Sequence, residues 1–210
     1  MVGKHKKLRE LLEPVRIREI GDATLRVVSR KGLEGTTMQE IADEAGLAKG
    51  TLYLYFESRE ELVVHVAESA FEELQLAVAE ALGRDVAFPE RLAAAILTHV
   101  EFFERRRDFF RLFLSVAHPG PGAERSARHS RTCNPLYRAY LDRLASFFAE
   151  GQALGEIRPF PPDRLALFVA EGLAGLILRR LGEIDPPPVE EDVRLVVDTL
   201  TSGINARRNP

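Results

Sequence analysis

A short stretch of the sequence combines residue types that can bind phosphate groups. Residues 46–62 read GLAKGTLYLYFESREEL. Lys49 supplies a positive charge, and the hydroxyl groups of Tyr53 and Tyr55 can donate hydrogen bonds to phosphate oxygens. Gly50 would let a backbone come close to a bulky anion, because it has no side chain. These residues could therefore hold the phosphate backbone of a nucleic acid.

The same stretch carries two conflicting secondary-structure signals. Residues 51–56, TLYLYF, are β-branched and aromatic with alternating apolar positions, which is typical of a half-buried strand. No other segment pairs an alternating pattern with turn residues, so a strand here would leave its backbone N–H and C=O groups unpaired. We therefore predict that this segment is part of a short helix, with Phe56 in the core.

The residues before this segment predict a helix, a tight turn and then the second helix. Residues 37–40, TMQE, form a capping box in which Thr37 is the N-cap and Glu40 reaches back. Ala42 is small enough for two helices to approach closely, and Gly46 suits a turn that needs a positive φ. Leu47 and Leu52 are expected to point into the contact between the two helices. This is the helix-turn-helix arrangement, whose second helix enters the DNA major groove.

Helical periodicity covers nearly all of the remaining sequence, which predicts an all-α protein. We expect an N-terminal three-helix helix-turn-helix domain followed by a larger helical bundle, with domains at 1–60 and 61–210; the family resemblance described below implies that the second is a ligand-binding and dimerisation domain. A second capping box, SREE at 58–61, opens a long helix that ends near Gly83. The other expected helices run from about 14 to 32, from 89 to 106, over 108–117, from 125 to 151, from 163 to 181 and from 189 to 204.

Positive charge is concentrated at the N-terminal end of the chain. The 210 residues have a net charge of −3. Residues 1–31 contain nine Lys and Arg and four acids, a sum of 9 − 4 = +5, so residues 32–210 carry −8. A basic end on an acidic body is the asymmetry expected when one end meets a polyanion. It argues against an architectural DNA-binding protein, which should be basic overall.

Residues 35–62, GTTMQEIADEAGLAKGTLYLYFESREEL, resemble the DNA-binding signature of the TetR family of bacterial transcriptional regulators. The resemblance runs from about Arg16 to Val66, roughly a quarter of the chain. It implies a homodimeric regulator, in most cases a repressor that a small molecule releases from a palindromic operator. By position it also implies DNA contacts from Thr36, Thr37, Gln39, Lys49, Gly50, Thr51, Tyr53, Tyr55 and Arg59. The sequence departs from the family pattern at two positions, with Ala48 in place of a capping serine and Leu54 in place of a polar residue.

Phenylalanines cluster in the C-terminal part, and most are expected to fill the core of a bundle. Some could instead line a ligand cavity between helices, with the arginine run at 105–107 as an anchor for phosphate or carboxylate. The candidate ligand residues are Phe102, Phe103, Arg106, Phe109, Phe110, Phe113 and Phe147. With no acid that looks buried among them, we expect an apolar effector, with a fatty acid or acyl-CoA as the first hypothesis. A sensor of aromatic or cationic drug-like compounds is the alternative.

The last two predicted helices, at 163–181 and 189–204, each carry an apolar face. Small residues line the apolar face of the helix at 163–181. Helices this apolar need a partner, and the family resemblance suggests a four-helix interface shared by two subunits. The candidate interface residues are Gly172, Gly175, Leu176, Val193, Val197 and Leu200.

An all-helical enzyme with a phenylalanine-lined pocket is the alternative from another functional class. It needs a nucleophile or an acid–base pair, and the sequence offers no such constellation, so we expect no enzyme, no cofactor and no metal. His65 and His99 have no second ligand four residues on, and we interpret the single cysteine, Cys133, as an ordinary thiol. A chain without an internal disulfide, without a signal peptide and without a long apolar run is expected in the cytoplasm, with no membrane partner.

Overall fold

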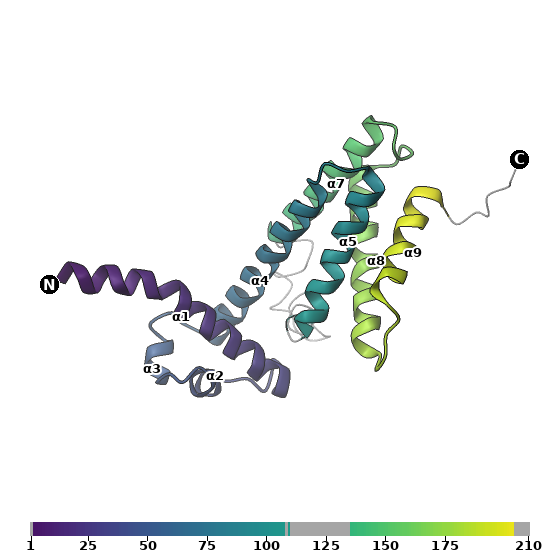
Figure 1. Cartoon of the computed structure of the whole chain (residues 1–210). Coiled ribbons are helices and arrows are strands. Elements are labelled where there is room, and N and C mark those ends of the chain that lie inside the picture. Colours follow the sequence, from purple (N-terminus) through teal and green to yellow (C-terminus); the bar gives the residue numbers. More distant parts are fainter. Residues whose placement is uncertain (1, 108, 110–134, 204–210) are drawn as a thin grey trace, which may run out of the picture. The chain divides into compact units, whose positions relative to one another are not determined.

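The computed structural model describes residues 2–107, 109 and 135–203. Within these residues it contains eight helices and no strand (Figure 1). The predicted all-α class is therefore confirmed. The expected helix over 108–117 and the start of the helix expected at 125 lie outside the described residues, as does Cys133.

The described chain divides into two compact units. The first contains the residues up to Ala70 together with Phe109, and the second contains Phe71–Arg107 and the described residues beyond 134. Helix α4, Arg59–Leu82, contributes residues to both. The domain boundary predicted at residues 60 and 61 stays a prediction; it falls in the first turn of this helix.

The first unit consists of α1 (Val2–Lys31), α2 (Met38–Glu44), α3 (Lys49–Leu52) and the start of α4. In α1, apolar residues repeat three or four positions apart, so they share one face and meet the other helices there. The fully buried residues are Ile20, Ala23 and Val27 of α1, Ile41 and Ala42 of α2, Leu52 of α3 and Leu62 of α4. This small core holds the two short helices in place.

Helix α1 differs from its prediction at the N-terminal end. The sequence predicted a start near Pro14, because proline lacks a backbone N–H and is common in the first turn of a helix. The structure instead begins α1 at Val2 and runs it through Pro14 (Figure 1). Its end agrees with the prediction: Gly32 has a φ of +74° and its N–H donates to the Val28 carbonyl at 2.8 Å.

The start of α4 contains half of the predicted capping box. The Glu61 N–H donates to the Ser58 hydroxyl oxygen at 3.1 Å, as expected. The Glu61 carboxylate, however, accepts from the Glu57 N–H at 2.6 Å rather than from Ser58. The reciprocal contact is therefore shifted one residue toward the N-terminus.

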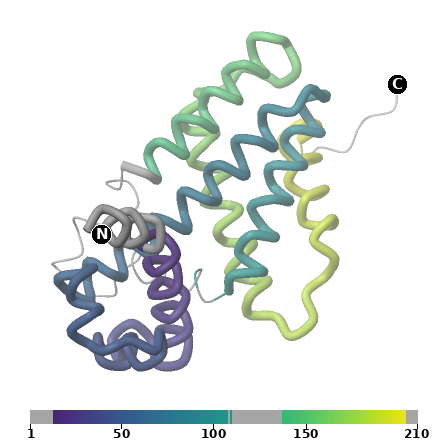
Figure 2. Tube along the Cα trace, turned by 60° about the vertical axis from the view of Figure 1, so that its left-hand side comes forward, coloured from purple at the N-terminus to yellow at the C-terminus, as the bar shows by residue number. Residues whose placement is uncertain are grey.

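The second unit contains the rest of α4 with α5 (Phe88–Arg105), α7 (Pro135–Ala153), α8 (Pro162–Gly182) and α9 (Val189–Ser202). Helix α8 packs beside α7 and α5, and α5 also packs beside α9 (Figure 2). The Phe88 ring stacks on Phe147, with centroids 4.5 Å apart and planes 9° from parallel. A Cβ atom at Gly151 would lie 2.6 Å from the Phe88 ring, so the glycine makes room for this stack.

A buried ion-pair network ties three helices of the second unit together. Arg180 of α8 is buried; its Nε donates to Glu104 of α5 at 2.7 Å, and its Nη1 donates to Asp192 of α9 at 2.6 Å. The same Nη1 donates to the Pro187 carbonyl at 2.9 Å. Asp192 is only 5% exposed. The expectation that this part of the chain has no buried acid is therefore wrong; the acid is tolerated because Arg180 pairs with it.

Candidate functional site

The turn between α2 and α3 is built by both capping signals read from the sequence. At the start of α2, the Glu40 N–H donates to the Thr37 hydroxyl oxygen and the Thr37 N–H donates to the Glu40 carboxylate at 3.0 Å. At its end, Gly46 has a φ of +66°, and the Leu47 N–H donates to the Ala42 carbonyl at 2.8 Å. This is a Schellman motif, which stops α2 and turns the chain toward α3. The predicted helix-turn-helix is confirmed.

Helix α3 is short, and its turns continue to Phe56 through hydrogen bonds between nearby backbone groups. The prediction that TLYLYF is not a strand is therefore confirmed. Leu52 and Phe56 are buried and anchor the segment to the unit. On the side of the segment that faces away from this core, Lys49 is exposed, and the side chains of Tyr53 and Leu54 are 46% and 72% exposed. The segment thus presents a cation, an aromatic ring and an apolar side chain to an outside partner.

Gly50 is not required by the fold of the chain itself. A Cβ atom at this position would meet no atom within 4 Å, and the residue does not have a positive φ. A glycine in a helix costs about 0.8–1 kcal/mol relative to alanine. The open surface above Gly50 is therefore available to a partner that must come close to the backbone. Lys49 next to it places its Nζ 5.9 Å from the centre of the Tyr53 ring.

Thr36 and Arg59 make hydrogen bonds within the protein, and the DNA contacts that the family resemblance implied for them stay a prediction. Thr36 is 1% exposed, and its hydroxyl donates to the Gly32 carbonyl at 2.8 Å. The Arg59 Nη1 donates to the carbonyls of Leu33 and Thr36, each at 3.1 Å. Its Nε and Nη2 donate to the Glu60 carboxylate. Both side chains therefore hold the segment between α1 and α2.

Thr37 and Gln39 lie on the exposed side of the start of α2. The Thr37 hydroxyl is part of the capping box described above. The Gln39 Nε2 donates to the Asp43 carboxylate at 2.8 Å, one turn further along the helix. A base edge that binds Gln39 would have to replace this contact.

Much of the N-terminal positive charge is neutralised within the first unit. Lys31 pairs with Glu40, while Arg26 and Arg30 both pair with Glu44. Hydrogen bonds from Lys31 and from Arg30 lower the pKa of the Glu40 carboxyl and of the Glu44 carboxyl, respectively. Lys49, by contrast, has no ion pair among the residues that the structure describes. It is thus a cation free to bind an anion.

The candidate ligand residues of the second half are mostly core residues. Phe102, Phe103, Phe109 and Phe147 are buried, while Phe110 and Phe113 lie outside the described residues. Arg106 pairs with Glu73 at 2.6 Å and stacks over Phe102, so it is not a free anchor.

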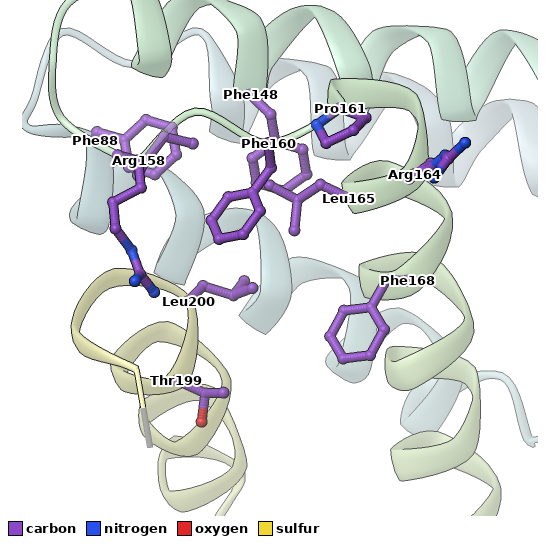
Figure 3. Close-up of a pocket in the computed structure, with 11 residues that line it drawn as sticks. Phe88, Phe148, Arg158, Phe160, Pro161, Arg164, Leu165, Phe168, Thr199 and Leu200 are labelled. Atoms are coloured by element: carbon purple, nitrogen blue, oxygen red, sulfur yellow. The ribbon is translucent and has the colours of Figure 1, made fainter. Parts of the chain in front are cut away.

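A cavity of about 320 Å³ in the second unit has a different lining. It lies among Phe88, Phe148, Phe160, Leu165, Phe168 and Leu200 (Figure 3). Phe148 and Phe168 belong to the phenylalanine cluster that the sequence showed, but Phe88, Phe160 and Leu165 were missed. The run PFPPD at 159–163, a phenylalanine among prolines between two helices, was the available signal. None of the candidate ligand residues that the structure describes lines this cavity, and their role in ligand binding stays a prediction.

The buried polar pair His99 and Tyr140 belongs to the core of the second unit. The His99 Nδ1 lies 3.2 Å from the Tyr140 hydroxyl oxygen. Burial lowers the pKa of His99 to about 4 and raises the pKa of Tyr140. His99 is therefore neutral at pH 7. Among the described residues, no group of three or more His, Cys, Asp or Glu could hold a metal ion.

The candidate interface residues fall into two groups. Gly172 and Gly175 are exposed on α8, where a Cβ atom would meet nothing within 4 Å, and Leu176 beside them is half-buried. Val193 and Val197 of α9 instead line a groove of about 290 Å³ with Ala93, Ala94 and Leu97 of α5. Leu200 lines the 320 Å³ cavity. The α9 residues thus turn part of their apolar surface toward their own chain.

None of the helices among the described residues is long and apolar enough to cross a bilayer.

An exposed α3 held by two buried anchors after a Schellman turn defines a DNA-binding protein of the helix-turn-helix class.

Two relatives and the sequence model of one family agree with this class, and one solved structure has the same fold. The model described as "Bacterial regulatory proteins, tetR family" matches residues 20–66. The HTH-type transcriptional regulator BetI of Rhizobium meliloti is 30% identical over 199 residues, which cover 93% of this chain and 92% of the relative. The fatty acid metabolism regulator protein of Bacillus subtilis is 24% identical over 148 residues, covering 70% and 74%. The crystal structure of the transcriptional regulator FadR from Bacillus subtilis in complex with stearoyl-CoA superposes with a TM-score of 0.76 at 21% identity, over 90% and 99% of the two chains.

The chain belongs to the TetR family of bacterial transcriptional regulators. The expectation that it is not an enzyme is confirmed by this membership.

Proposed function

We propose that this regulator is a homodimeric repressor that binds a palindromic operator and leaves it when a small apolar effector binds. The observation that carries the proposal is the exposed face of α3, where Lys49, Gly50 and Tyr53 are presented while Leu52 and Phe56 anchor the segment. Because Leu52 and Phe56 hold this surface in place and Lys49 has no ion pair among the described residues, the surface can bind a rigid polyanion.

In this proposal the N-terminal part of α3 enters the major groove. Lys49, Thr51, Tyr53 and Tyr55 contact phosphates, and Gly50 allows the close approach. Leu54, fully available at the surface, makes an apolar contact of the kind that thymine methyl groups accept. Gln39 reaches a base edge and Thr37 a phosphate from the start of α2. Thr36 and Arg59 position these groups without touching DNA.

The dimer of this proposal forms on α8. Gly172 and Gly175 leave the helix backbone open, and the neighbouring Phe168 and Leu178 are 68% and 54% exposed. Large apolar side chains beside exposed glycines favour close packing against a second helix. A two-fold pairing would place two α3 helices on successive major grooves, roughly 34–36 Å apart.

The effector of this proposal is an apolar compound with an acidic group, with fatty acyl compounds as the first class to test. The fold shared with a regulator solved in complex with stearoyl-CoA supports this class. The alternative, an aromatic cation, is favoured by one observation in the second unit. The Tyr137 hydroxyl donates to the Glu171 carboxylate at 2.6 Å beside the rings of Phe71 and Tyr140, and aromatic rings with a carboxylate attract cations.

Selection of duplexes from a random pool tests the DNA-binding part of the proposal. We expect the full chain to enrich an inverted repeat whose half-sites lie about one helical turn apart. Acyl-CoAs of graded length and planar aromatic cations are then added to the complex, and release is followed by fluorescence anisotropy. Release by aromatic cations alone would favour the alternative effector, and enrichment of no inverted repeat would contradict the dimeric repressor. The chain would act in the bacterial cytoplasm, where its operator lies.

A further inference from the structure

The 320 Å³ cavity is lined by four helices of the second unit and by the segment between α7 and α8. Phe88 comes from the start of α5, Phe148 from α7, Leu165 and Phe168 from α8, and Leu200 from α9. Phe160 closes the space from the segment between α7 and α8 (Figure 3). These side chains are all apolar, so the cavity attracts apolar rather than sugar-like compounds.

The walls of this cavity are held by contacts outside it. The Phe88 ring is fixed by its stack on Phe147 and by the glycine at 151. The Gln152 side-chain amide donates to the Phe160 carbonyl at 2.8 Å, which fixes the segment between α7 and α8. A cavity whose walls are set in this way is available before a ligand arrives.

Two aromatic rings of the cavity are open to water in the single chain, although the α8 interface proposed above would cover part of Phe168. Phe160 is 44% exposed and Phe168 is 68% exposed. Apolar surface left in water is unfavourable relative to burying it. An apolar compound in the cavity would cover part of both rings.

One cation is placed to hold an anionic group at the edge of the cavity. Arg158 lies 5.5 Å from the Phe160 ring centre and extends along the edge toward Leu200 (Figure 3). It makes no hydrogen bond or ion pair among the residues that the structure describes, and no acidic residue lines the cavity. Arg164 also lines the cavity, but Figure 3 shows its guanidinium pointing away from the space.

We propose that this cavity binds an apolar monocarboxylate, with its chain or ring among the phenylalanines and its carboxylate on Arg158. The volume sets the size, because 320 Å³ holds about ten water-sized groups at about 30 Å³ each. That suits a medium-chain or aromatic acid and is too small to hold a complete acyl-CoA inside the cavity. The role of this site in regulation rests on the proposed function, whereas binding itself does not.

Calorimetric titration of the full chain without DNA tests the site. The probes are octanoate, octanol and octylammonium, which share a chain and differ in charge. We expect saturable binding of octanoate at one per chain, about tenfold tighter than octanol or octylammonium, because only the carboxylate can pair with Arg158.

Variants separate the anchor from general charge effects. Arg158→Gln should weaken octanoate binding about tenfold and leave octanol unchanged. Arg164→Gln, the matched control, removes the same charge from the same cavity lining and should leave octanoate binding unchanged. Leu165→Trp should fill the space and remove binding of octanoate and octanol alike. Circular dichroism and thermal unfolding check that each variant folds.

The proposal is overturned if octylammonium binds as tightly as octanoate, or if the two arginine variants lose the same affinity. It is also overturned if octanoate binds the monomeric variant Gly175→Arg but not the wild-type dimer, since a second copy would then occupy the cavity. Octanoate that binds through Arg158 without releasing operator supports the site and counts against the proposed release. Operator release by octanoate without binding sensitive to Arg158 overturns the site and leaves the release mechanism standing.

Discussion

The guanidinium of Arg59 donates a hydrogen bond to the backbone carbonyl of Thr36 at 3.1 Å. The same Nη1 also bonds the Leu33 carbonyl, so the first residue of α4 holds the segment that leads into α2. Thr36 is buried and precedes the N-cap residue of α2. The pair therefore links the position of the helix-turn-helix to α4.

Replacing Arg59 by Gln should lower operator affinity without changing its salt dependence. The variant loses both carbonyl contacts and so loosens α2, but it removes no phosphate contact. We expect a free energy of unfolding lower by about 1–3 kcal/mol, measured by urea titration. Anisotropy titrations at several salt concentrations should give the wild-type slope. A slope reduced by about one unit would instead assign Arg59 to a phosphate.

Lys49→Ala should weaken binding to operator and to random duplex by similar factors. Lys49 has no ion pair among the residues that the structure describes, and we propose that it contacts a phosphate. The slope of log K against log salt should fall by about one unit. Arg59→Gln is the control, because we expect it to lower affinity by loosening α2 while leaving the salt slope unchanged. A loss confined to the operator would point to a base contact for Lys49.

Gln39→Ala should relax the preference for one base pair in each half-site. The side chain bonds Asp43 in the free chain and would exchange this partner for a base edge. Discrimination at that position should fall by about 1–3 kcal/mol, measured with single-substitution operators. Equal losses on all duplexes, random ones included, would show that Gln39 reads no base.

Gly175→Arg should produce monomers that bind the operator poorly. The position is exposed on α8 with open space around it, so an arginine fits the monomer but not a close helix pair. Sedimentation should show the wild type as a dimer at micromolar concentration. Ala153→Arg, an exposed position at the end of α7, is the matched control and should stay dimeric. Finding the wild type monomeric would refute the interface and the inverted-repeat operator together.

Replacing His99 by Gln should remove part of the loss of stability at acidic pH. Burial lowers the pKa of His99 to about 4 in the folded chain, against about 6.5 when unfolded. The unfolded chain therefore binds the extra proton first, and stability falls as the pH drops below about 6.5. Between pH 7 and pH 5 the wild type should lose about 2 kcal/mol more than the variant. Parallel urea titrations at the two pH values measure this, and identical losses would contradict a neutral buried His99.

The sequence alone determined the parts of this protein that depend on neighbours along the chain. The capping box at Thr37, the turn at Gly46 and the helical character of residues 51–56 follow from local hydrogen bonding and from the lack of a strand partner. These signals, at the spacing that the TetR family shows, were enough to identify a helix-turn-helix regulator.

Only the tertiary structure decided which side chains are free. Thr36 and Arg59 match the family pattern in sequence, yet their polar atoms bond carbonyls that the fold brings near them. Asp192 is buried because Arg180, twelve residues earlier, meets it across two helices. The cavity lined by Phe88, Phe160 and Leu200 joins residues more than a hundred positions apart. Pairing and burial depend on long-range packing, which no local pattern encodes.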